Sequence, residues 1–406
     1  MRGLEARVHE VLERRLRADS RRPVAVALSG GGDSLALLLM ADAWARRAGR
    51  PLVVLTVDHG LQAASAGWTD ACAATAARLG RPFQALAWTA EKPTTGLPAA
   101  ARAARHALLA DAARAAGAGV LLMGHTADDR AEAGAMRAAG ATTPDPREWA
   151  PSPAWPQGRG VFVLRPLLDV GRTELRAWLA ARGEAWIDDP ANTDPRYARS
   201  RVRRDGVAPP PPVPAPEPLA LAVEVSEMAG VLSLDRDRLL VAPEDDALRL
   251  IGLACVCAGG GARRPAGPRL ARLVAALRGD DEIVATLAGA RIEARGGQVR
   301  IFREAGEARR AGLAPVVVSR DRMVWDGRFE LSAAAGEIRA LAGLARRLPR
   351  DQQAALKALP PAARRALPAR VAADGAADCP ALAGTAHSLV LDRLRAAAGL
   401  VSSEPV

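Results

Sequence analysis

A carboxylate stands inside a short glycine-rich segment, Ser29-Gly30-Gly31-Gly32-Asp33-Ser34. The apolar run at 24–28 predicts a buried strand before this segment, and 35–40 begins an apolar helix after it. A loop between a strand and a helix can hold phosphate, because its backbone N–H groups and the helix N-terminus point at the anion. The six residues Ser29 to Ser34 are therefore predicted to bind a nucleotide.

Asp33 indicates which phosphate chemistry this loop performs. An acid beside a triphosphate is unfavourable unless a cation lies between them, so Asp33 predicts a Mg²⁺ ion bound together with ATP. The loop also lacks the lysine with which a Walker A loop steadies the β- and γ-phosphates. This favours attack at the α-phosphate, which is adenylation with pyrophosphate as leaving group. The alternative is a tight turn in which Asp33 only caps the helix.

Two further groups of polar residues follow predicted strands. Asp58 and His59 end the strand at 52–57, and we interpret them as part of the nucleotide site rather than as a polar strand terminus. The stretch GHTADDRAEA at 124–133 contains His125, Asp129 and Glu132. Asp129 and Glu132 are three residues apart and share a helical face. Acids at a helix N-terminus are also favoured by the helix dipole, whatever the function.

These residues are positioned by strands that alternate with helices. Strand-like runs occur at 24–28, 52–57, 82–88, 120–123 and 161–164, and apolar residues at helical spacing occur at 35–48, 66–80, 98–117, 127–139 and 172–183. This alternation predicts an α/β fold with a parallel sheet and helices on both faces. Ligands bind such sheets at the carboxyl ends of the strands, where the polar residues above lie.

The chain is long enough for more than one domain. We expect a catalytic domain at 1–205, a Pro-rich linker at 206–218 and a C-terminal accessory region at 219–406. The C-terminal region is the smaller one, and we expect it to have a mixed helical and α+β structure. Residues 219–279 are predicted to be helical, and residues 282–304 to form short strands around a Gly-Gly turn. Residues 140–160 form a long Pro/Gly-rich loop.

Composition indicates the class of partner and the compartment. The net charge of +11 suits a polyanionic partner, although 54 of the 56 basic residues are arginine. The N-terminal residues mix acids with arginines, unlike a signal or transit peptide, and no apolar stretch has membrane-spanning length. We therefore expect a cytoplasmic protein without a membrane partner. Cys255 and Cys257 are interpreted as buried core residues rather than as metal ligands.

Five stretches in this order resemble one enzyme family. SGGGDS resembles the SGGxDS signature of the N-type ATP pyrophosphatases, the PP-loop superfamily. VDHGL at 57–61, ARAARHALL at 101–109, GHTADDRAEA at 124–133 and the segment 164–204 with RPLL, RTEL and WIDDPAN narrow the resemblance to the tRNA(Ile)-lysidine synthetases. His106 stands where that family usually has tyrosine, and Ala133 where it usually has threonine. The resemblance implies an adenine-nucleotide alpha-hydrolase-like fold.

The resemblance also implies a reaction and its partners. ATP adenylates the 2-oxo group of the wobble cytidine in an isoleucine tRNA with a CAU anticodon, and the side-chain amine of L-lysine displaces AMP. Asp129 and Glu132 would hold the lysine and take a proton from its amine, with His125 as the alternative base. A homodimer is left open.

The predicted tRNA contacts are a run of arginines and the C-terminal region 219–406. Arg196, Arg199, Arg201 and Arg203, with Arg204 and Tyr197, suit a splayed-out anticodon nucleotide, which needs phosphate pairing and base stacking. A solvated basic face is the alternative. Two other functions remain: a tRNA thiolase of the same superfamily, which usually needs cysteines near the site, and a non-catalytic RNA-binding relative.

Overall fold

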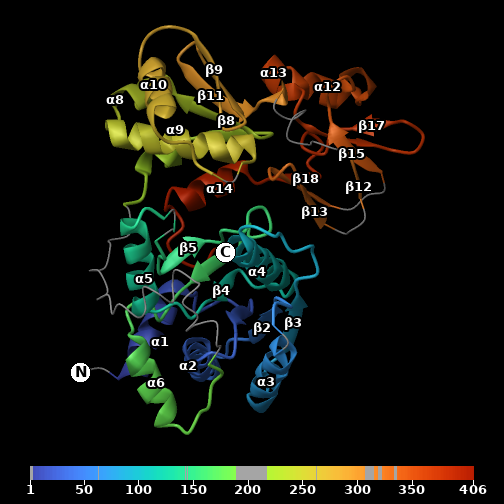
Figure 1. The fold of residues 1–406 in the computed structure, drawn as a ribbon. Helices are drawn as coiled ribbons and strands as arrows, with labels where there is room; N and C mark the ends of the chain where they lie inside the picture. Colours follow the sequence, from blue (N-terminus) through green and yellow to red (C-terminus); the bar gives the residue numbers. More distant parts are fainter. Residues whose placement is uncertain are drawn as a thin grey trace. The chain divides into compact units, whose positions relative to one another are not determined.

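The computed structural model describes residues 3–62, 64–141, 143, 145–188, 217–261, 263–306, 315–318, 322–332 and 336–406. They form two compact units, which are considered separately: Met1–Pro216 with Val401–Val406 is unit 1, and Glu217–Leu400 is unit 2 (Figure 1). Among the described residues, no helix combines the length and the apolar character that crossing a bilayer requires.

Unit 1 contains a six-stranded sheet that confirms the predicted α/β fold. Its order is β3-β2-β1-β4-β6-β5. The parallel strands are β1 (Val24–Ala27), β2 (Leu52–Asp58), β3 (Phe83–Ala87), β4 (Val120–Leu122) and β6 (Phe162–Leu164). The edge strand β5 (Trp149–Pro151) pairs antiparallel with β6, inside the stretch predicted to be only a loop. Trp149 stacks on Phe162 at 4.8 Å, and this cross-strand pair helps to hold the short edge strand.

Helices cover both faces of this sheet, as predicted. The helices are α1 (Leu4–Arg15), α2 (Gly32–Ala48), α3 (Ser65–Arg78), α4 (Leu97–Ala115), α5 (Ala127–Ala138) and α6 (Arg172–Ala180). Side chains alternate along β1: Val24 and Val26 join a core with α1, α2, α3 and α6. Ala25 faces the opposite side and joins a core with α4. The apolar run of β1 is therefore continuous because the strand is buried on both faces.

Residues 401–406 return to unit 1 after the whole of unit 2. The Glu404 carboxylate is fully buried, pairs with the buried Arg50 and accepts from the Arg17 backbone N–H at 3.0 Å. Arg50 also donates to the carbonyls of Arg22 and Arg17, at 2.7 and 2.8 Å. Trp149 Nε1 donates to the carbonyl of Val401 at 2.7 Å. We call residues 401–406 the returning tail.

The first part of unit 2 is a five-stranded antiparallel sheet packed on helices. Its order is β7-β8-β11-β10-β9, with β7 (Ser226–Met228), β8 (Val231–Asp235), β9 (Ile283–Leu287), β10 (Ala290–Arg295) and β11 (Gln298–Arg303). The accompanying helices are η2 (Ala220–Glu224), α8 (Arg236–Val241), α9 (Glu244–Gly259), α10 (Pro268–Leu277) and α14 (Val390–Ala397). The strands predicted at 282–304 are present, with Gly296 and Gly297 in the turn between β10 and β11.

The prediction that 219–279 is helical throughout was wrong at β7 and β8. These strands pair as an antiparallel hairpin, with Ser226 opposite Ser233. Ala229 and Gly230 turn the chain with φ values of 48° and 82°. A turn with two positive φ values matches the twist of a hairpin. Of its two residues, only Gly230 is of a type that indicates such a turn in the sequence.

The second part of unit 2 contains two small sheets and short helices. One sheet has the order β12-β15-β16-β17 and the other β13-β14-β18. Their bounds are β12 (Val316–Val317), β13 (Arg322–Trp325), β14 (Phe329–Ser332), β15 (Glu337–Ala340), β16 (Pro368–Val371), β17 (Ala377–Asp378) and β18 (Ala386–Ser388), with η3 (Ala345–Arg347), α12 (Arg350–Leu356) and α13 (Pro361–Arg364).

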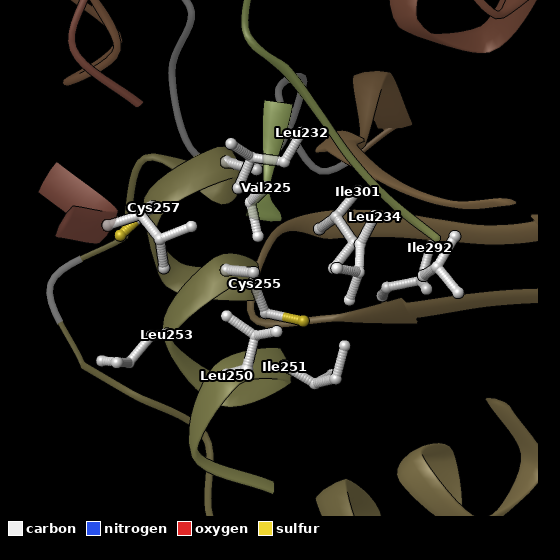
Figure 2. Close-up of a cluster of buried hydrophobic side chains, with 14 of the residues drawn as sticks. Val225, Leu232, Leu234, Leu250, Ile251, Leu253, Cys255, Cys257, Ile292 and Ile301 are labelled. Atoms are coloured by element: carbon white, nitrogen blue, oxygen red, sulfur yellow. The ribbon is translucent and has the colours of Figure 1, made fainter. Parts of the chain in front are cut away.

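Cys255 and Cys257 lie on α9 in the core of unit 2, as predicted. Figure 2 shows Cys255 among Leu234 and Ile292 of the sheet, whereas Cys257 lies on another side of the helix. Residues two apart in an α-helix are separated by about 200° around the axis, so these thiols do not converge on a metal. Burial raises the pKa of each thiol to about 12.

Candidate active site

The glycine-rich segment connects β1 to α2 as a tight loop. Ser34 Oγ donates to the Gly31 carbonyl at 2.9 Å and accepts from the Ser29 N–H at 3.1 Å. Gly30 has φ +80°, and a Cβ there would come within 2.5 Å of Ile187 Cδ1. The Ile187 N–H donates to the Gly30 carbonyl at 2.9 Å, so the segment after α6 packs directly against the loop. Gly30 is required both for its conformation and for this close approach.

Asp33 does not cap α2. The N-cap of that helix is Gly31, which has no side-chain cap, whereas Asp33 Oδ2 accepts from Arg172 Nε at 3.0 Å. Burial raises the pKa of Asp33; Arg172 opposes this effect and Asp129 adds to it. The simple capping alternative for Asp33 therefore has no support in the geometry.

Three carboxylates of the predicted site converge on Arg172. Besides Asp33, the guanidinium lies 3.3 Å from Glu132 Oε1 and 3.6 Å from Asp129 Oδ1. Burial opposes the charge of Arg172, but Asp33, Asp129 and Glu132 together raise its pKa above the ordinary value. We call Asp33, Asp129 and Glu132 the acidic cluster. It places three negative charges where a bound cation would be stabilised.

Asp129 also has a structural role. Thr126 is the N-cap of α5, and Asp129 completes a capping box: its Oδ2 accepts from the Thr126 N–H at 2.9 Å. The Asp128 carboxylate accepts from the backbone N–H of Arg172 at 2.7 Å, at the start of α6. One oxygen of Asp129 is thus used by the cap, and the other faces Arg172. Glu132 has no such capping duty and is only 3% exposed.

His125 lies between β4 and α5, next to a buried arginine. Its Nδ1 accepts from Arg165 Nε at 3.2 Å. Because arginine is always the donor, this Nδ1 carries no proton, and in the neutral ring the proton is on Nε2. His125 is therefore arranged to donate from Nε2, which disfavours the role of proton acceptor predicted as an alternative.

Asp58 and His59 follow β2, as predicted. Asp58 Oδ1 accepts from the Gly60 N–H at 2.7 Å and so stabilises the turn after the strand. The His59 ring meets Trp88 edge-on at 6.2 Å, and burial lowers its pKa. Their predicted place in the nucleotide site stays a prediction.

The predicted tRNA-contact residues Arg196, Arg199, Arg201, Arg203 and Arg204 lie outside the described residues, as does most of the linker at 206–218. Asp188, the first aspartate of the WIDDPAN stretch, is described and pairs with Arg176 at 3.2 Å. The division of function between the two units also stays a prediction.

Sequence reasoning did not assign site roles to Arg172 and Arg165. Arg172 is the first residue of RTEL and Arg165 the first of RPLL, two stretches on which the family resemblance rests. The resemblance could therefore have indicated them as site residues. Their roles depend on tertiary neighbours that spacing along the chain does not reveal. Trp186 is a third such residue, because its indole lies 3.4 Å from the position of a Cβ on Gly32.

Comparison with known proteins identifies the family. A PP-loop domain model matches residues 3–209. The tRNA(Ile)-lysidine synthase of Caulobacter vibrioides is 48% identical over 98% of both chains. That of Hyphomonas neptunium is 35% identical over 78% of this chain and 90% of its own.

A solved structure shows a weaker likeness. The U34-tRNA thiolase NcsA from Methanococcus maripaludis, which has a [4Fe-4S] cluster, covers 50% of this chain and 71% of its own, with a TM-score of 0.41 and 17% identity. This likeness is too low to bear on activity. The match of the PP-loop domain and the nearly full-length identity to lysidine synthases show that this chain belongs to the tRNA(Ile)-lysidine synthase family of PP-loop proteins.

Proposed function

We propose that this chain converts the wobble cytidine of an isoleucine tRNA with a CAU anticodon to lysidine. ATP adenylates the 2-oxo group of the base, and the side-chain amine of free L-lysine then displaces AMP. The observation that carries the proposal is the juxtaposition of a lysine-free glycine-rich loop with the acidic cluster. A loop that cradles phosphates and a cluster that holds a cationic amine are the two sites this reaction needs.

The residues present are compatible with Mg²⁺. Mg²⁺ is usually bound by one or two carboxylates together with substrate phosphates and water, rather than by a cage of protein ligands. Among the described residues no group of three or more His, Cys, Asp or Glu forms such a cage. Asp33, at the start of α2, is the residue we assign to the ion. When bound, the ion would neutralise charge on the phosphates.

Glu132 is the residue we assign as proton acceptor for the attacking amine. An ammonium group cannot attack, so the lysine side chain must lose a proton before the new C–N bond forms. His125 is arranged to donate, and Asp129 is partly engaged in the cap of α5. Glu132 is buried beside Arg172, close to Asp33 of the loop. Asp129 and Glu132 together would hold the amine before its deprotonation.

Unit 1 would carry this chemistry, and unit 2 with the arginines at 196–204 would hold the tRNA. An anticodon loop needs a wider contact than one site, and the target base must leave its stack to reach the nucleotide. Because the substrates would be ATP and tRNA, we expect the reaction to take place in the cytoplasm.

A thiolase reaction is not favoured by the cysteines. All four are buried, including Cys72, which lies near the loop at Gly30. Burial raises the pKa of Cys72, whereas sulfur chemistry needs the thiolate.

The decisive experiment incubates the purified chain with labelled lysine, ATP and tRNA. We expect label to enter RNA, with AMP and pyrophosphate as the other products. Formation of ADP and orthophosphate, or lysine left wholly unincorporated in the presence of a CAU isoleucine tRNA, would contradict the proposal. Added labelled sulfide or persulfide serves as a control that detects thiolase activity.

A further inference from the structure

Arg172 occupies the place that the proposed amine substrate needs. Its Nε donates to Asp33 Oδ2 at 3.0 Å, its Nη1 donates to Glu132 Oε1 at 3.3 Å, and its Nη2 lies 3.6 Å from Asp129 Oδ1. Each guanidinium nitrogen thus faces a different carboxylate of the acidic cluster. Asp129 and Glu132 are the residues assigned above to the ammonium group of lysine, so a cation of the chain itself already fills that subsite.

The guanidinium is more accessible to solvent than the two carboxylates of that subsite. The side chain of Arg172 is 18% exposed, against 11% for Asp129 and 4% for Glu132. Asp33, on the glycine-rich loop, is the most exposed of the four side chains at 22%. Arg172 can therefore leave the inner carboxylates for a partner on the side of the loop, where the phosphates of a nucleotide would lie.

The main chain at Arg172 is held independently of the acidic cluster. Arg172 is the first residue of α6, after the N-cap Gly171, and its backbone N–H donates to the Asp128 carboxylate at 2.7 Å. The contacts with the acidic cluster come from the guanidinium at the end of a flexible side chain. A rotation of that side chain would release the carboxylates without any movement of α6.

MgATP would change the balance of charges around Arg172. A positive charge that already lies beside Asp129 and Glu132 opposes the binding of a second cation in the same place. Asp33 gives Arg172 its shortest contact within the acidic cluster, and it is also the residue assigned above to Mg²⁺. Bound MgATP would engage this acceptor and bring phosphate oxygens, which a guanidinium binds through planar pairs of N–H donors.

We propose that Arg172 is a displaceable counter-ion that opens the amine subsite when ATP binds. The inference rests on the proposed function. Without nucleotide, the guanidinium neutralises the acidic cluster and excludes a second cation. With nucleotide, it turns to the phosphates, and Asp129 and Glu132 receive the ammonium group of the substrate. Nucleotide therefore binds first and lysine second, so the amine reaches its subsite only when the group that activates the base is in place.

The test measures how strongly nucleotide and lysine binding depend on each other. Titration calorimetry gives the lysine affinity of the full chain in Mg²⁺ alone, with adenosine, and with an ATP analogue whose α,β bridge cannot be cleaved. Arg172→Gln is the test variant. Arg182→Gln is the matched control, because Arg182 is exposed, pairs with Glu5 and lies 3.8 Å from the centre of the Trp178 ring. Thermal melts check that each variant is folded.

We expect the analogue to raise the lysine affinity of the wild-type chain roughly 5- to 150-fold, the usual range for coupling between two sites. Adenosine should not raise it, because adenosine has no phosphate to draw the guanidinium away. Arg172→Gln should bind lysine more tightly than the wild type without nucleotide, and the analogue should then add little. The control should behave as the wild type does.

A fixed counter-ion predicts a different result. If Arg172 stays on the carboxylates, Arg172→Gln tightens lysine binding by the same factor with and without the analogue, and this outcome would overturn the proposal. Equal lysine affinity of the wild-type chain with and without the analogue would also overturn it. Arg172→Lys serves if the glutamine variant does not fold: it keeps a cation but loses the planar donor pairs, so its coupling factor should fall below that of the wild type.

Cadaverine, the diamine left when lysine loses its carboxylate, separates this proposal from the proposed function. If the chain binds cadaverine with an affinity that the analogue raises, but does not bind lysine, lysine is not the substrate and the displaceable counter-ion stands. If the analogue binds and neither amine binds with or without it, both proposals fail.

Discussion

Replacing Glu404 by glutamine should destabilise unit 1, because Glu404 is the buried ion-pair partner of Arg50. The change keeps the size of the side chain and removes the charge that compensates Arg50. In the structure both partners are buried, with side-chain exposures of 0% for Glu404 and 3% for Arg50. Arg50 is further held by two backbone carbonyls, so it cannot readily turn to solvent.

The size of the effect follows from this burial. Removing one partner of a buried ion pair costs about 3–5 kcal/mol, because the other charge is left uncompensated. We take about 3 kcal/mol for Glu404→Gln, since the amide can still hydrogen-bond. A unit of 150–250 residues loses roughly 2–4 °C in Tm for each kcal/mol, so the expected decrease is about 6–12 °C.

An exposed ion pair of the same unit supplies the control. Arg7 and Glu174 pair with side-chain exposures of 42% and 48%. Such pairs contribute about 0–1 kcal/mol, so Glu174→Gln should lower the Tm by no more than about 4 °C. The double variant Arg50→Met with Glu404→Leu removes both charges, which is often neutral, but it also leaves the carbonyls of Arg17 and Arg22 without their donor. It should therefore recover only part of the stability that Glu404→Gln removes.

Differential scanning calorimetry measures these effects. The transition of unit 1 is identified as the one whose midpoint rises with a bound ATP analogue. A Glu404→Gln variant that shifts this transition no more than Glu174→Gln would refute the reasoning. It would mean that the returning tail does not contribute to the stability of unit 1.

Three further outcomes are expected. Asp33→Asn should lower the rate of AMP formation on the order of 10²–10³-fold. Tm should change little, since Asp33 is no cap and Asp129 and Glu132 still compensate Arg172; near-normal turnover would leave Asp33 without a catalytic role. His106 has a folded pKa of about 3 against 6.5, so stability should be full above pH 6.5 and fall by ~1.4 kcal/mol per pH unit below it. Denaturant unfolding of wild type and His106→Phe measures this, and an identical pH dependence in both would contradict it. A chain of residues 1–216 joined to 401–406 by a Gly/Ser linker should keep ATP binding. Its tRNA affinity should depend less on salt: the slope of log K against log salt concentration should be smaller by roughly 0.7–0.9 for each phosphate that unit 2 neutralises in the full chain. An unchanged slope would argue against a role for unit 2 in holding tRNA.

The sequence predicted the central elements of unit 1 because their signals are local. The buried run at Val24–Ala27 and the glycine turn after it specify a strand and a loop through their own residues. The short antiparallel strand Trp149–Pro151 was not predicted, because its support is the stacking of Trp149 on Phe162 and not its own pattern.

The acidic residues of the candidate site were predicted from the sequence, but its arginines were not. Asp33, Asp129 and Glu132 are close to loops and helix starts that the sequence reveals. Arg172 contacts Asp33 and Glu132, and Arg165 contacts His125. These partners are 40 to 139 residues away along the chain. No periodicity within one element encodes such a contact.

The returning tail has a consequence for the order in which the molecule is made. Arg50 and Glu404 are 354 residues apart, and translation proceeds at about 5–20 residues per second, so Arg50 waits on the order of tens of seconds for its partner. During that interval Arg50 of the nascent nucleotide-binding unit has no carboxylate partner, although its guanidinium is buried in the completed structure. Its last step of folding is therefore tied to the completion of residues 401–406. An mRNA truncated within the coding region of unit 2 would yield a nucleotide-binding unit that lacks the partner of Arg50. Such an incompletely folded unit is a substrate for the cell's proteases.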